Sequence, residues 1–399
     1  MKKLNVGLFI DTFYPMVDGV IQVVDQYATR LNKFCNVTVF TTAPRRGRVD
    51  DKVHPYKVVK CKVMAVPGQD YDLALVGSDK EYRKALKESN LDIVHIHSPF
   101  SIGKSGVKYA KKHHIPVIAT MHSQYKQDFY KATKIKWLSN ALTANIMKVF
   151  NKCDGCYAVN KRIAQIYFED YKAKKLPGVL LNGTDFMPVE DKTKARKLVN
   201  EKYNLQDDVP LFLFVGRLTV LKNILFIVEA LKKLKESGQT FKMMYVGTGI
   251  DEDKLKAKIQ ELQLENDIIL TGKIMDRELL KAIYSRADLF LFPSYYDANS
   301  LVQIEAASQK TPTVFLEGSA TSASVTNDVN GFIAPNDVQA FADKIKDVVN
   351  DEKLYQRVKE SAYTDLYRTW DECVEDAYNL YVKFVEENRQ KGIENKEKK

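Results

Sequence analysis

The chain has 399 residues, of which 45% are hydrophobic and 28% are charged. This is the balance of a globular protein with enough apolar residues for two domain cores, and it excludes a disordered chain. No apolar run approaches the roughly 20 residues that a membrane-spanning helix needs, and five scattered cysteines do not suit a disulfide framework. We therefore expect a cytoplasmic protein without a transmembrane helix.

The positive charge is concentrated in one segment. Residues 101–178 contain fifteen Lys and Arg against four Asp and Glu, a net charge of +11, whereas the whole chain carries +10. A local positive field of this kind suits an anionic partner, either a membrane surface or a polyanionic substrate. A solvated, lysine-rich face is the alternative interpretation.

In the first half of the chain, short β-branched runs alternate with helical patterns. The expected strands are 6–10, 37–41, 58–63, 93–96, 117–120, 157–159 and 179–181. Strands separated by crossover helices predict a parallel sheet with helices on both faces.

The pattern then starts again, which predicts a second domain of the same kind. The expected strands of this second series are 211–215, 243–246, 268–270, 289–292, 313–315 and 332–334. A charged stretch at 188–208 separates the two series, so we place the domain junction near residue 186. The predicted domains are 1–186 and 187–375, with a C-terminal helix at about 376–399 packing back on the first. An aromatic-rich helix is expected over 363–387, with a frayed tail from 388.

Both domains are expected to be doubly wound α/β sheets of the Rossmann type. Ligands of such sheets bind at the carboxyl ends of the strands. Function should therefore concentrate in a cleft that both sets of strand ends line.

The loop after the first strand carries Gly19 at the start of a helix predicted over 21–31. A glycine there lets a ligand approach the backbone amides and the positive end of the helix dipole, which suits a diphosphate. Many α/β folds contain such a turn without binding a ligand.

Two cations follow the first strand of the second series. Arg217 lies just after Gly216, and Lys222 precedes a helix predicted over 224–235. Positive side chains are unfavourable at a helix amino terminus, and an anionic ligand would offset that cost. We interpret the pair as a phosphate site, with plain surface charge as the alternative.

Two acids follow the strand at 289–292. Asp297 lies in the loop, and Glu305 comes eight residues later in an apolar helical context. A buried carboxylate is costly unless it accepts hydrogen bonds, and ribose hydroxyls are suitable donors. A salt-bridged core glutamate is the alternative for Glu305.

Three histidines lie near strand ends in the first domain. His95 and His97 alternate on one strand, but no third ligand for a metal is evident, so no metal site is expected. His97 and His122 are expected to line the cleft edge. His122 would donate or accept a hydrogen bond with a sugar hydroxyl, or it would simply end its strand.

Taken in order, these features resemble the retaining glycosyltransferases of family 4 over nearly the whole chain. The residues that carry the resemblance are Gly19, His122, Asn182-Gly183-Thr184-Asp185, Gly216-Arg217, Lys222, Val246-Gly247-Thr248-Gly249, Asp297 and Glu305. The resemblance implies two Rossmann-like domains facing across a cleft, the architecture called GT-B.

The resemblance also implies roles for these residues. Arg217 and Lys222 would neutralise the donor diphosphate, Glu305 would hold the ribose, and His122 and Asp297 would contact the transferred sugar. The implied donor-binding set is Gly19, Gly216, Gly247, Asn299, Ser300, Leu301, Val302 and Glu305, with His97 and Tyr125 on the acceptor side. One departure concerns the sugar: Asp297-Ala298-Asn299-Ser300 replaces the usual Glu followed by Gly-Phe-Gly.

The implied reaction moves a hexose, expected to be glucose, from a UDP-sugar to an acceptor hydroxyl with retention and without a metal or other cofactor. The first domain would bind the acceptor and the second the nucleotide sugar. A sugar-nucleotide epimerase of the same architecture is the alternative enzyme class. A nucleic-acid-binding protein is disfavoured because the basic segment lacks known docking motifs. The oligomeric state is not determined by the sequence.

The acceptor is suggested by a basic amphipathic helix predicted over 131–150. Its apolar residues are Ile135, Leu138, Leu142, Ile146 and Val149, with Trp137 and several lysines around them. Such a helix lies in a membrane interface or packs on its own domain. Together with the positive segment, it favours peripheral binding to an anionic membrane and a lipid acceptor, such as diacylglycerol or a lipid-linked glycan. A soluble, capsular or cell-wall glycan is the alternative acceptor.

Overall fold

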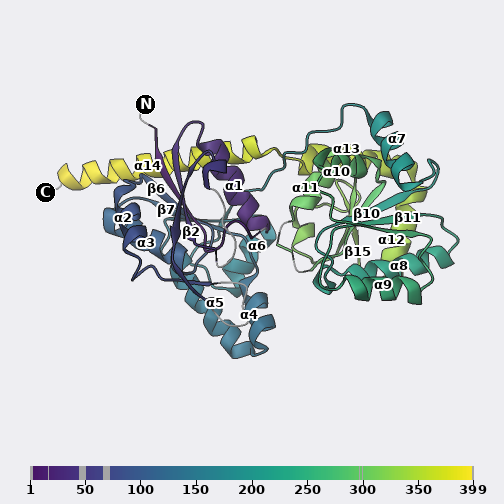
Figure 1. Ribbon diagram of the computed structural model, residues 1–399, viewed down its shortest axis with the longest axis horizontal. Helices are drawn as coiled ribbons and strands as arrows, with labels where there is room; N and C mark the ends of the chain where they lie inside the picture. Colours follow the sequence, from purple (N-terminus) through teal and green to yellow (C-terminus); the bar gives the residue numbers. More distant parts are fainter. Residues whose placement is uncertain are drawn as a thin grey trace. The chain divides into compact units, whose positions relative to one another are not determined.

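The computed structural model describes residues 3–16, 18–44, 51–65, 72–295, 297–298 and 300–397. The chain forms two compact units, and Figure 1 labels many of their helices and strands. Unit 1 comprises Met1–Asn182 and Trp370–Lys399, and unit 2 comprises Gly183–Thr369. The chain therefore passes into unit 2 within the Asn182-Gly183-Thr184-Asp185 turn and returns to unit 1 at Trp370.

Unit 1 is built on a seven-stranded parallel sheet of order β3-β2-β1-β6-β7-β8-β9. Its strands are β1 (Asn5–Phe9), β2 (Asn36–Thr42), β3 (Lys57–Cys61), β6 (Ile93–Ile96), β7 (Val117–Met121), β8 (Gly155–Ala158) and β9 (Gly178–Val179). The strands β4 (Val63–Ala65) and β5 (Asp72–Ala74) form a separate antiparallel pair. The predicted parallel sheet is confirmed.

The helices of unit 1 include one that the chain contributes after leaving unit 2. They are α1 (Gly19–Leu31), η1 (Asp51–Val53), α2 (Lys80–Glu88), α3 (Ser101–His113), α4 (Tyr125–Thr133), α5 (Lys136–Phe150), α6 (Lys161–Gln165), the π-helical turn η2 (Ile166–Asp170) and α14 (Trp370–Glu397). Figure 1 shows α14, in yellow, lying along unit 1. It buries Trp370, Tyr381 and Val385 there.

The helix predicted over 131–150 is wrong in one respect, because the segment contains two helices. Lys134 adopts a left-handed conformation, with φ of 57°, which ends α4. The hydroxyl of Thr133 donates to Phe129 O at 2.7 Å and accepts from Ile135 N at 3.3 Å, so it stabilises the break. The Ser139 hydroxyl donates to Lys126 O at 2.7 Å and holds α5 against α4.

Unit 2 is built on a six-stranded parallel sheet of order β12-β11-β10-β13-β14-β15, the doubly wound order in which the first strand lies at the centre. Its strands are β10 (Leu211–Val215), β11 (Lys242–Val246), β12 (Ile268–Gly272), β13 (Leu289–Phe292), β14 (Thr313–Leu316) and β15 (Phe332–Ala334). All six were predicted at nearly these positions.

The helices of unit 2 correct the prediction of one helix over 363–387. They are α7 (Lys192–Tyr203), η3 (Val220–Lys222), α8 (Ile224–Glu236), α9 (Glu252–Glu261), α10 (Arg277–Arg286), α11 (Leu301–Ser308), η4 (Thr321–Ser324), α12 (Val338–Asn350) and α13 (Glu352–Leu366). The predicted helix spans the end of α13 and the start of α14, which are separate helices. The tail expected to fray from 388 is instead helical as far as Glu397.

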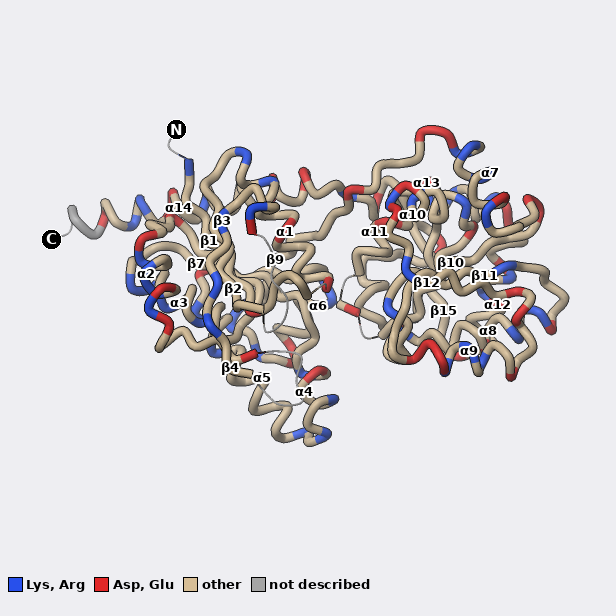
Figure 2. Tube along the Cα trace, in the orientation of Figure 1, with Lys and Arg blue, Asp and Glu red and all other residues tan. Residues whose placement is uncertain are grey.

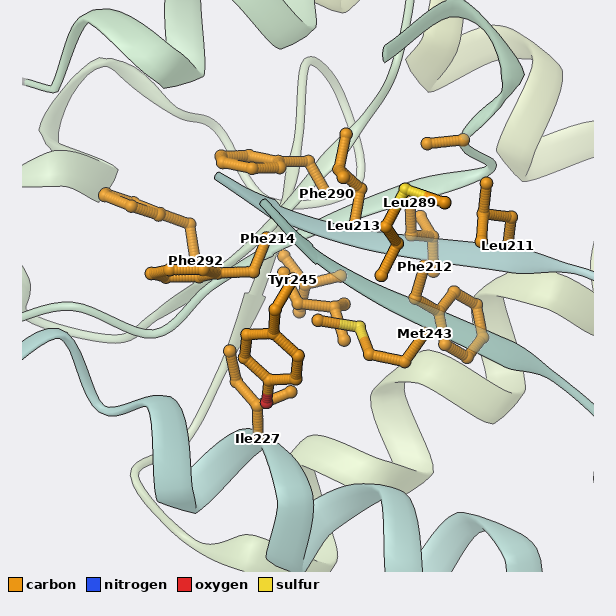
Figure 3. Packing of buried hydrophobic residues seen from close by; sticks show 14 of the residues in the cluster. Leu211, Phe212, Leu213, Phe214, Ile227, Met243, Tyr245, Leu289, Phe290 and Phe292 are labelled. Atoms are coloured by element: carbon orange, nitrogen blue, oxygen red, sulfur yellow. The ribbon is translucent and has the colours of Figure 1, made fainter. Parts of the chain in front are cut away.

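The core of unit 2 explains why its strands read as continuous apolar runs. Phe212, Phe214, Phe290 and Phe292 are fully buried on neighbouring strands, as Figure 3 shows, because helices cover both faces of a parallel sheet. The Tyr245 hydroxyl donates to Ile224 O at 2.9 Å and joins β11 to the start of α8. This packing holds the carboxyl ends of β10, β11 and β13 in place.

Candidate functional site

Two glycines allow the chain segments that leave β10 and β11 to pack closely. Gly247 has φ of +139°, and a Cβ at this residue would lie 1.9 Å from the carbonyl oxygen of Gly216. Gly216 itself has φ of +155° and donates its N–H to Val246 O at 3.0 Å. Only glycine meets both the conformation and the close approach at Gly247. The predicted donor-binding glycines Gly216 and Gly247 are therefore in contact at the carboxyl edge of the sheet.

Lys222 forms an ion pair with the first of the two predicted acids. Its Nζ lies 2.6 Å from Oδ1 of Asp297, and the two side chains are 13% and 15% exposed. The Ser294 hydroxyl donates to Oδ2 of Asp297 at 2.7 Å. The anion that we expected to offset the Lys222 charge is thus supplied, in this structure, by the protein itself.

The two loops that bear this ion pair are also joined through Asn223. This residue has a left-handed conformation, with φ of 60°, at the start of α8. Its Nδ2 donates to Pro293 O at 3.0 Å. Because β10 and β13 are neighbours in the sheet, this bond joins the loop of Lys222 to the loop of Asp297.

Arg217 differs from Lys222 in its surroundings. Its side chain is exposed, and no ion pair to it is found among the described residues. The guanidinium group is therefore accessible to an anionic ligand, and its forked donors suit phosphate oxygens.

Glu305 lies in α11 with its carboxylate enclosed. The Tyr284 hydroxyl donates to Oε2 at 3.0 Å, and Tyr284 itself is fully buried in α10. Burial raises the pKa of the Glu305 carboxyl group, while the Tyr284 hydrogen bond and the charge of Arg277 oppose that rise. One carboxylate oxygen is thus oriented by tyrosine, and no hydrogen bond to the other is found among the described residues.

Neither Tyr284 nor Arg277, the two neighbours of Glu305, was predicted from the sequence. Tyr284 belongs to an ordinary amphipathic helix pattern, and Arg277 is the first residue of the same helix. The Arg277 guanidinium lies 4.3 Å from the centre of the Phe186 ring. The signal for these residues is a buried tyrosine that faces a buried acid. It can be recognised only when α10 and α11 are known to be adjacent.

The remaining donor-binding candidates lie at the start of α11. Ser300 precedes the helix, and its hydroxyl makes no capping bond. The first N–H groups of a helix have no partner within it, so those of Leu301 and Val302 suit an anionic ligand. The predicted residue Asn299 lies outside the described residues.

Gly19 is the first residue of α1, two residues earlier than the predicted helix start. Nothing lies within 4 Å of a Cβ built there, so a ligand could approach this backbone. However, the Asp18 carboxylate accepts a hydrogen bond from Ile21 N at 2.8 Å and caps the helix. A negative charge thus already occupies the helix end that we expected to bind a diphosphate.

The three predicted histidines of unit 1 lie together, with His95 and His97 almost fully enclosed and His122 8% exposed. His97 Nδ1 lies 3.0 Å from His122 Nε2, and the ring centres of His95 and His97 are 4.0 Å apart. Burial lowers the pKa of His95 and of His122 to about 3, and it lowers that of His97 well below its usual value. The three rings are therefore neutral at physiological pH.

Tyr125, the second predicted residue on the acceptor side, is a packed aromatic. It is the first residue of α4, and its ring lies 5.6 Å from Phe100 and 6.2 Å from Phe129, measured between centres. It therefore supports the start of α4.

The junction of α4 and α5 carries a surface that is both apolar and basic, which we call the α4–α5 tip. Tyr130, Ile135 and Trp137 are 50%, 42% and 70% exposed. Lys134 and Lys136 are exposed beside them, and Figure 2 shows basic residues at this tip. The later apolar residues of α5, such as Ile146 and Val149, are buried within unit 1.

The start of the predicted amphipathic segment is thus exposed, and its end packs on its own domain. None of the helices in the described ranges combines the length and hydropathy of a membrane span.

Each unit of the chain is built on a parallel sheet with its first strand inside the sheet. In unit 2, Lys222 follows β10, and Asp297 and Glu305 follow the neighbouring strand β13. These are the features of a GT-B glycosyltransferase. The family described as Glycosyltransferase Family 4 matches residues 17–186, and the one described as Glycosyl transferases group 1 matches residues 195–365. The two matches cover most of both units, and the chain belongs to the family 4 glycosyltransferases.

Similar proteins include lipid glycosyltransferases. An alpha-monoglucosyldiacylglycerol synthase from Streptococcus pneumoniae is 27% identical over 320 residues, which cover 78% of this chain and 70% of the relative. A protein of the same name from Acholeplasma laidlawii is 22% identical over 97% of this chain and 99% of its own length. Among solved structures, Anabaena HepE in complex with UDP-glucose has a TM-score of 0.71 at 15% identity, covering 94% of this chain and 99% of its own.

Proposed function

We propose that this glycosyltransferase moves glucose from UDP-glucose to the hydroxyl of a membrane lipid, with retention of configuration and without a metal ion. The observation that carries the donor half of the proposal is the meeting of Lys222 and Asp297 at adjacent strand ends, with Glu305 in the helix α11 that follows the Asp297 loop. The acceptor half rests on the α4–α5 tip and on the two similar diacylglycerol glucosyltransferases.

In this proposal unit 2 binds the nucleotide sugar. The carboxylate of Glu305, oriented by Tyr284, accepts hydrogen bonds from the ribose hydroxyls. Arg217, Lys222 and the first N–H groups of α11 then receive the diphosphate. The complex of HepE with UDP-glucose supports the choice of nucleotide and sugar.

The ion pair between Lys222 and Asp297 suggests an exchange of partners on donor binding. A diphosphate carries more charge than a carboxylate and draws the Lys222 ammonium group toward itself. Oδ1 of Asp297 then becomes an acceptor for a hydroxyl of the sugar. Because Asp is one methylene shorter than Glu, the sugar must approach this loop more closely than it would approach a glutamate.

The reaction in this proposal needs no nucleophile from the protein. The bond between the sugar C1 and the diphosphate oxygen breaks, and the acceptor hydroxyl attacks C1 from the same face. The hydroxyl proton passes to the departing phosphate oxygen. Arg217 and Lys222 stabilise the negative charge that develops on the leaving group, and one such preorganised donor is worth about 3 kcal/mol.

Unit 1 binds the acceptor lipid at a membrane surface in this proposal. Trp137, Ile135 and Tyr130 enter the interface, where aromatic side chains with one polar end are favourable. Lys134 and Lys136 face anionic headgroups, each contributing about 1 kcal/mol. The net charge of +11 on residues 101–178 attracts the rest of this face to the same membrane.

The test is a transfer assay with the full chain. UDP-glucose and other nucleotide sugars are offered to vesicles containing diacylglycerol, with a soluble glycan as the competing acceptor and EDTA present in a parallel series. Mass spectrometry identifies the product, and the proton coupling at C1 reports its configuration.

We expect an α-linked glucolipid from UDP-glucose, formed equally well with EDTA. An inverted product, a requirement for metal or transfer only to the soluble glycan would each overturn the corresponding part of the proposal. Release of an epimerised sugar nucleotide would instead indicate the epimerase class.

A further inference from the structure

A chain of buried polar contacts runs from α14 through the histidines of unit 1. The Tyr381 hydroxyl lies 2.7 Å from His95 Nδ1, and the Thr120 hydroxyl lies 2.8 Å from His95 Nε2. His95 therefore has partners for both ring nitrogens. Its ring packs on that of His97, whose Nδ1 in turn contacts His122 Nε2.

His97 is held in its position by packing on several sides. Its side chain is 1% exposed, and the Tyr27 ring meets it edge-on with ring centres 5.8 Å apart. His122 directly follows the neighbouring strand β7, and His95 stands two residues earlier, on β6. In the structure the imidazole of His97 is oriented with Nδ1 toward His122.

The other nitrogen of His97 decides which ring donates the hydrogen bond. Nε2 of His97 is enclosed and has no hydrogen-bond partner among the residues that the structure describes. If it carried a proton, a donor would be buried without an acceptor, and orphaned buried N–H groups are rarer in proteins than acceptors with unused lone pairs. The proton of neutral His97 is therefore placed on Nδ1.

We propose that His97 is a positioning residue that donates its Nδ1 proton to His122 Nε2 and thereby holds His122 in the tautomer with the proton on its own Nδ1. His122 then has one use for ligand binding, as a hydrogen-bond donor through Nδ1. Resting on the proposed function, this assigns to His122 the donation of a hydrogen bond to an oxygen of the transferred sugar.

The assignment excludes a general base at this position. Nε2 of His122 is occupied by the bond from His97, and Nδ1 already bears a proton. Burial keeps both rings uncharged, so the tautomer persists across the physiological pH range. A neutral donor adds no positive charge beside the sugar, and the charge stabilisation falls to Arg217 and Lys222.

Nuclear magnetic resonance of the ¹⁵N-histidine-labelled full chain tests the tautomer directly. Long-range proton–nitrogen correlations distinguish a protonated from an unprotonated ring nitrogen, and His122→Asn and His97→Asn variants assign the signals. We expect Nδ1 protonated in both His97 and His122. A proton on Nε2 of His122 would overturn the proposal, whatever the enzyme is found to catalyse.

Kinetics test the consequence. His97→Leu removes the donor to His122, whereas the amide nitrogen of His97→Asn replaces Nδ1. We expect His97→Leu to lower kcat about 5- to 10-fold, the worth of one hydrogen bond, and His97→Asn to restore most of it. Equal losses in both variants would overturn the positioning role.

Tyr381→Phe is the control for lost stability. It removes a buried hydroxyl at the far end of the same chain, where His95 loses one partner, but leaves the contact between His97 and His122 in place. We expect a lower Tm with kcat nearly unchanged. If the wild-type chain had no transferase activity, the proposed function would be wrong, but the spectra would still test the tautomer of His122.

Discussion

The ammonium group of Lys222 lies 2.6 Å from Oδ1 of Asp297, although 75 residues separate them in the chain. The pair joins the loop after β10 to the loop after β13, and Ser294 holds the second carboxylate oxygen. Lys222 and Asp297 thus neutralise each other's charge in this structure. We assign them separate roles once the donor binds. This relationship leads to the first two predictions.

Lys222→Ala is expected to lower kcat/KM by about 10² or more, because a preorganised cation on the leaving group is lost. Part of the effect comes from Asp297, whose half-buried carboxylate then stands unpaired beside the diphosphate. Steady-state transfer measures it, and a melting curve checks that the fold is intact. Lys353→Ala on the exposed face of α13 is the matched control. A near-normal rate in Lys222→Ala would remove its assigned role.

Asp297→Asn is expected to change binding and turnover in opposite directions. The neutral amide holds the Lys222 ammonium group less tightly than the carboxylate does, so the cation binds UDP more tightly, by about 1 kcal/mol or 5-fold. Turnover falls because the sugar loses a charged acceptor. Titration calorimetry with UDP, alongside the transfer assay, separates the two effects. Weaker binding of UDP would show that Lys222 and Asp297 do not exchange partners.

Tyr284→Phe is expected to weaken UDP binding about 5-fold, since Glu305 loses the hydroxyl that orients its carboxylate. Glu305→Ala should weaken it further. Tyr245→Phe provides the control, because it removes another buried hydroxyl in unit 2, from the contact with Ile224 O. Calorimetry should show unchanged UDP affinity in that variant. Equal affinity losses in both tyrosine variants would point to general destabilisation.

Trp137→Ala is expected to reduce binding to anionic vesicles about 10-fold or more, from the apolar area that no longer enters the interface. Its side chain is 70% exposed, so the Tm should be unchanged. Lys134→Glu should weaken binding chiefly at low salt. Co-sedimentation with anionic and neutral vesicles measures both, with Met275→Ala, an exposed apolar residue of unit 2, as the control. Vesicle binding that is unchanged in both Trp137→Ala and Lys134→Glu would rule out the α4–α5 tip as the membrane-binding surface.

Unit 1 is expected to lose stability as the pH falls below about 6.5. Burial lowers the pKa of His95 and of His122 to about 3. Below pH 6.5 these two histidines therefore take up protons in the unfolded chain but stay neutral in the folded chain. The stabilisation is complete above the unfolded pKa of about 6.5 and is lost below it, at about 1.4 kcal/mol per pH unit for each histidine. Urea denaturation at a series of pH values measures the slope.

The His122→Asn variant should show a shallower dependence of stability on pH. Variants of the exposed residues His113 and His114 to Gln should keep the wild-type slope. A stability that is constant between pH 6.5 and 4.5 would contradict the burial of neutral histidines.

Much of the fold could be predicted because local patterns record it. The strands of both sheets are buried on two faces, so each appears as a short apolar run, and helical periodicity between them implies parallel pairing. The residues at which the helices begin and end were predicted less accurately. The break at Lys134 depends on a left-handed residue and on the side chain of Thr133, which apolar spacing does not reveal.

The site was predictable to the extent that its residues stand in recognisable loops. Arg217, Lys222, Asp297 and Glu305 were found as charged residues after strands or in apolar helices, where their charge requires a partner. Their roles remain predictions. Tyr284 was not predicted because its hydroxyl reaches Glu305 only when α10 packs beside α11.

The sequence by itself determined the two α/β units, the family and the candidate site residues, since periodicity, glycine positions and buried charges are properties of short segments. Only the tertiary structure decided which side chains meet: Lys222 with Asp297, Glu305 with Tyr284, and His97 with His122. These contacts join residues on different strands and helices. Their geometry depends on packing across the whole unit, which no local pattern encodes.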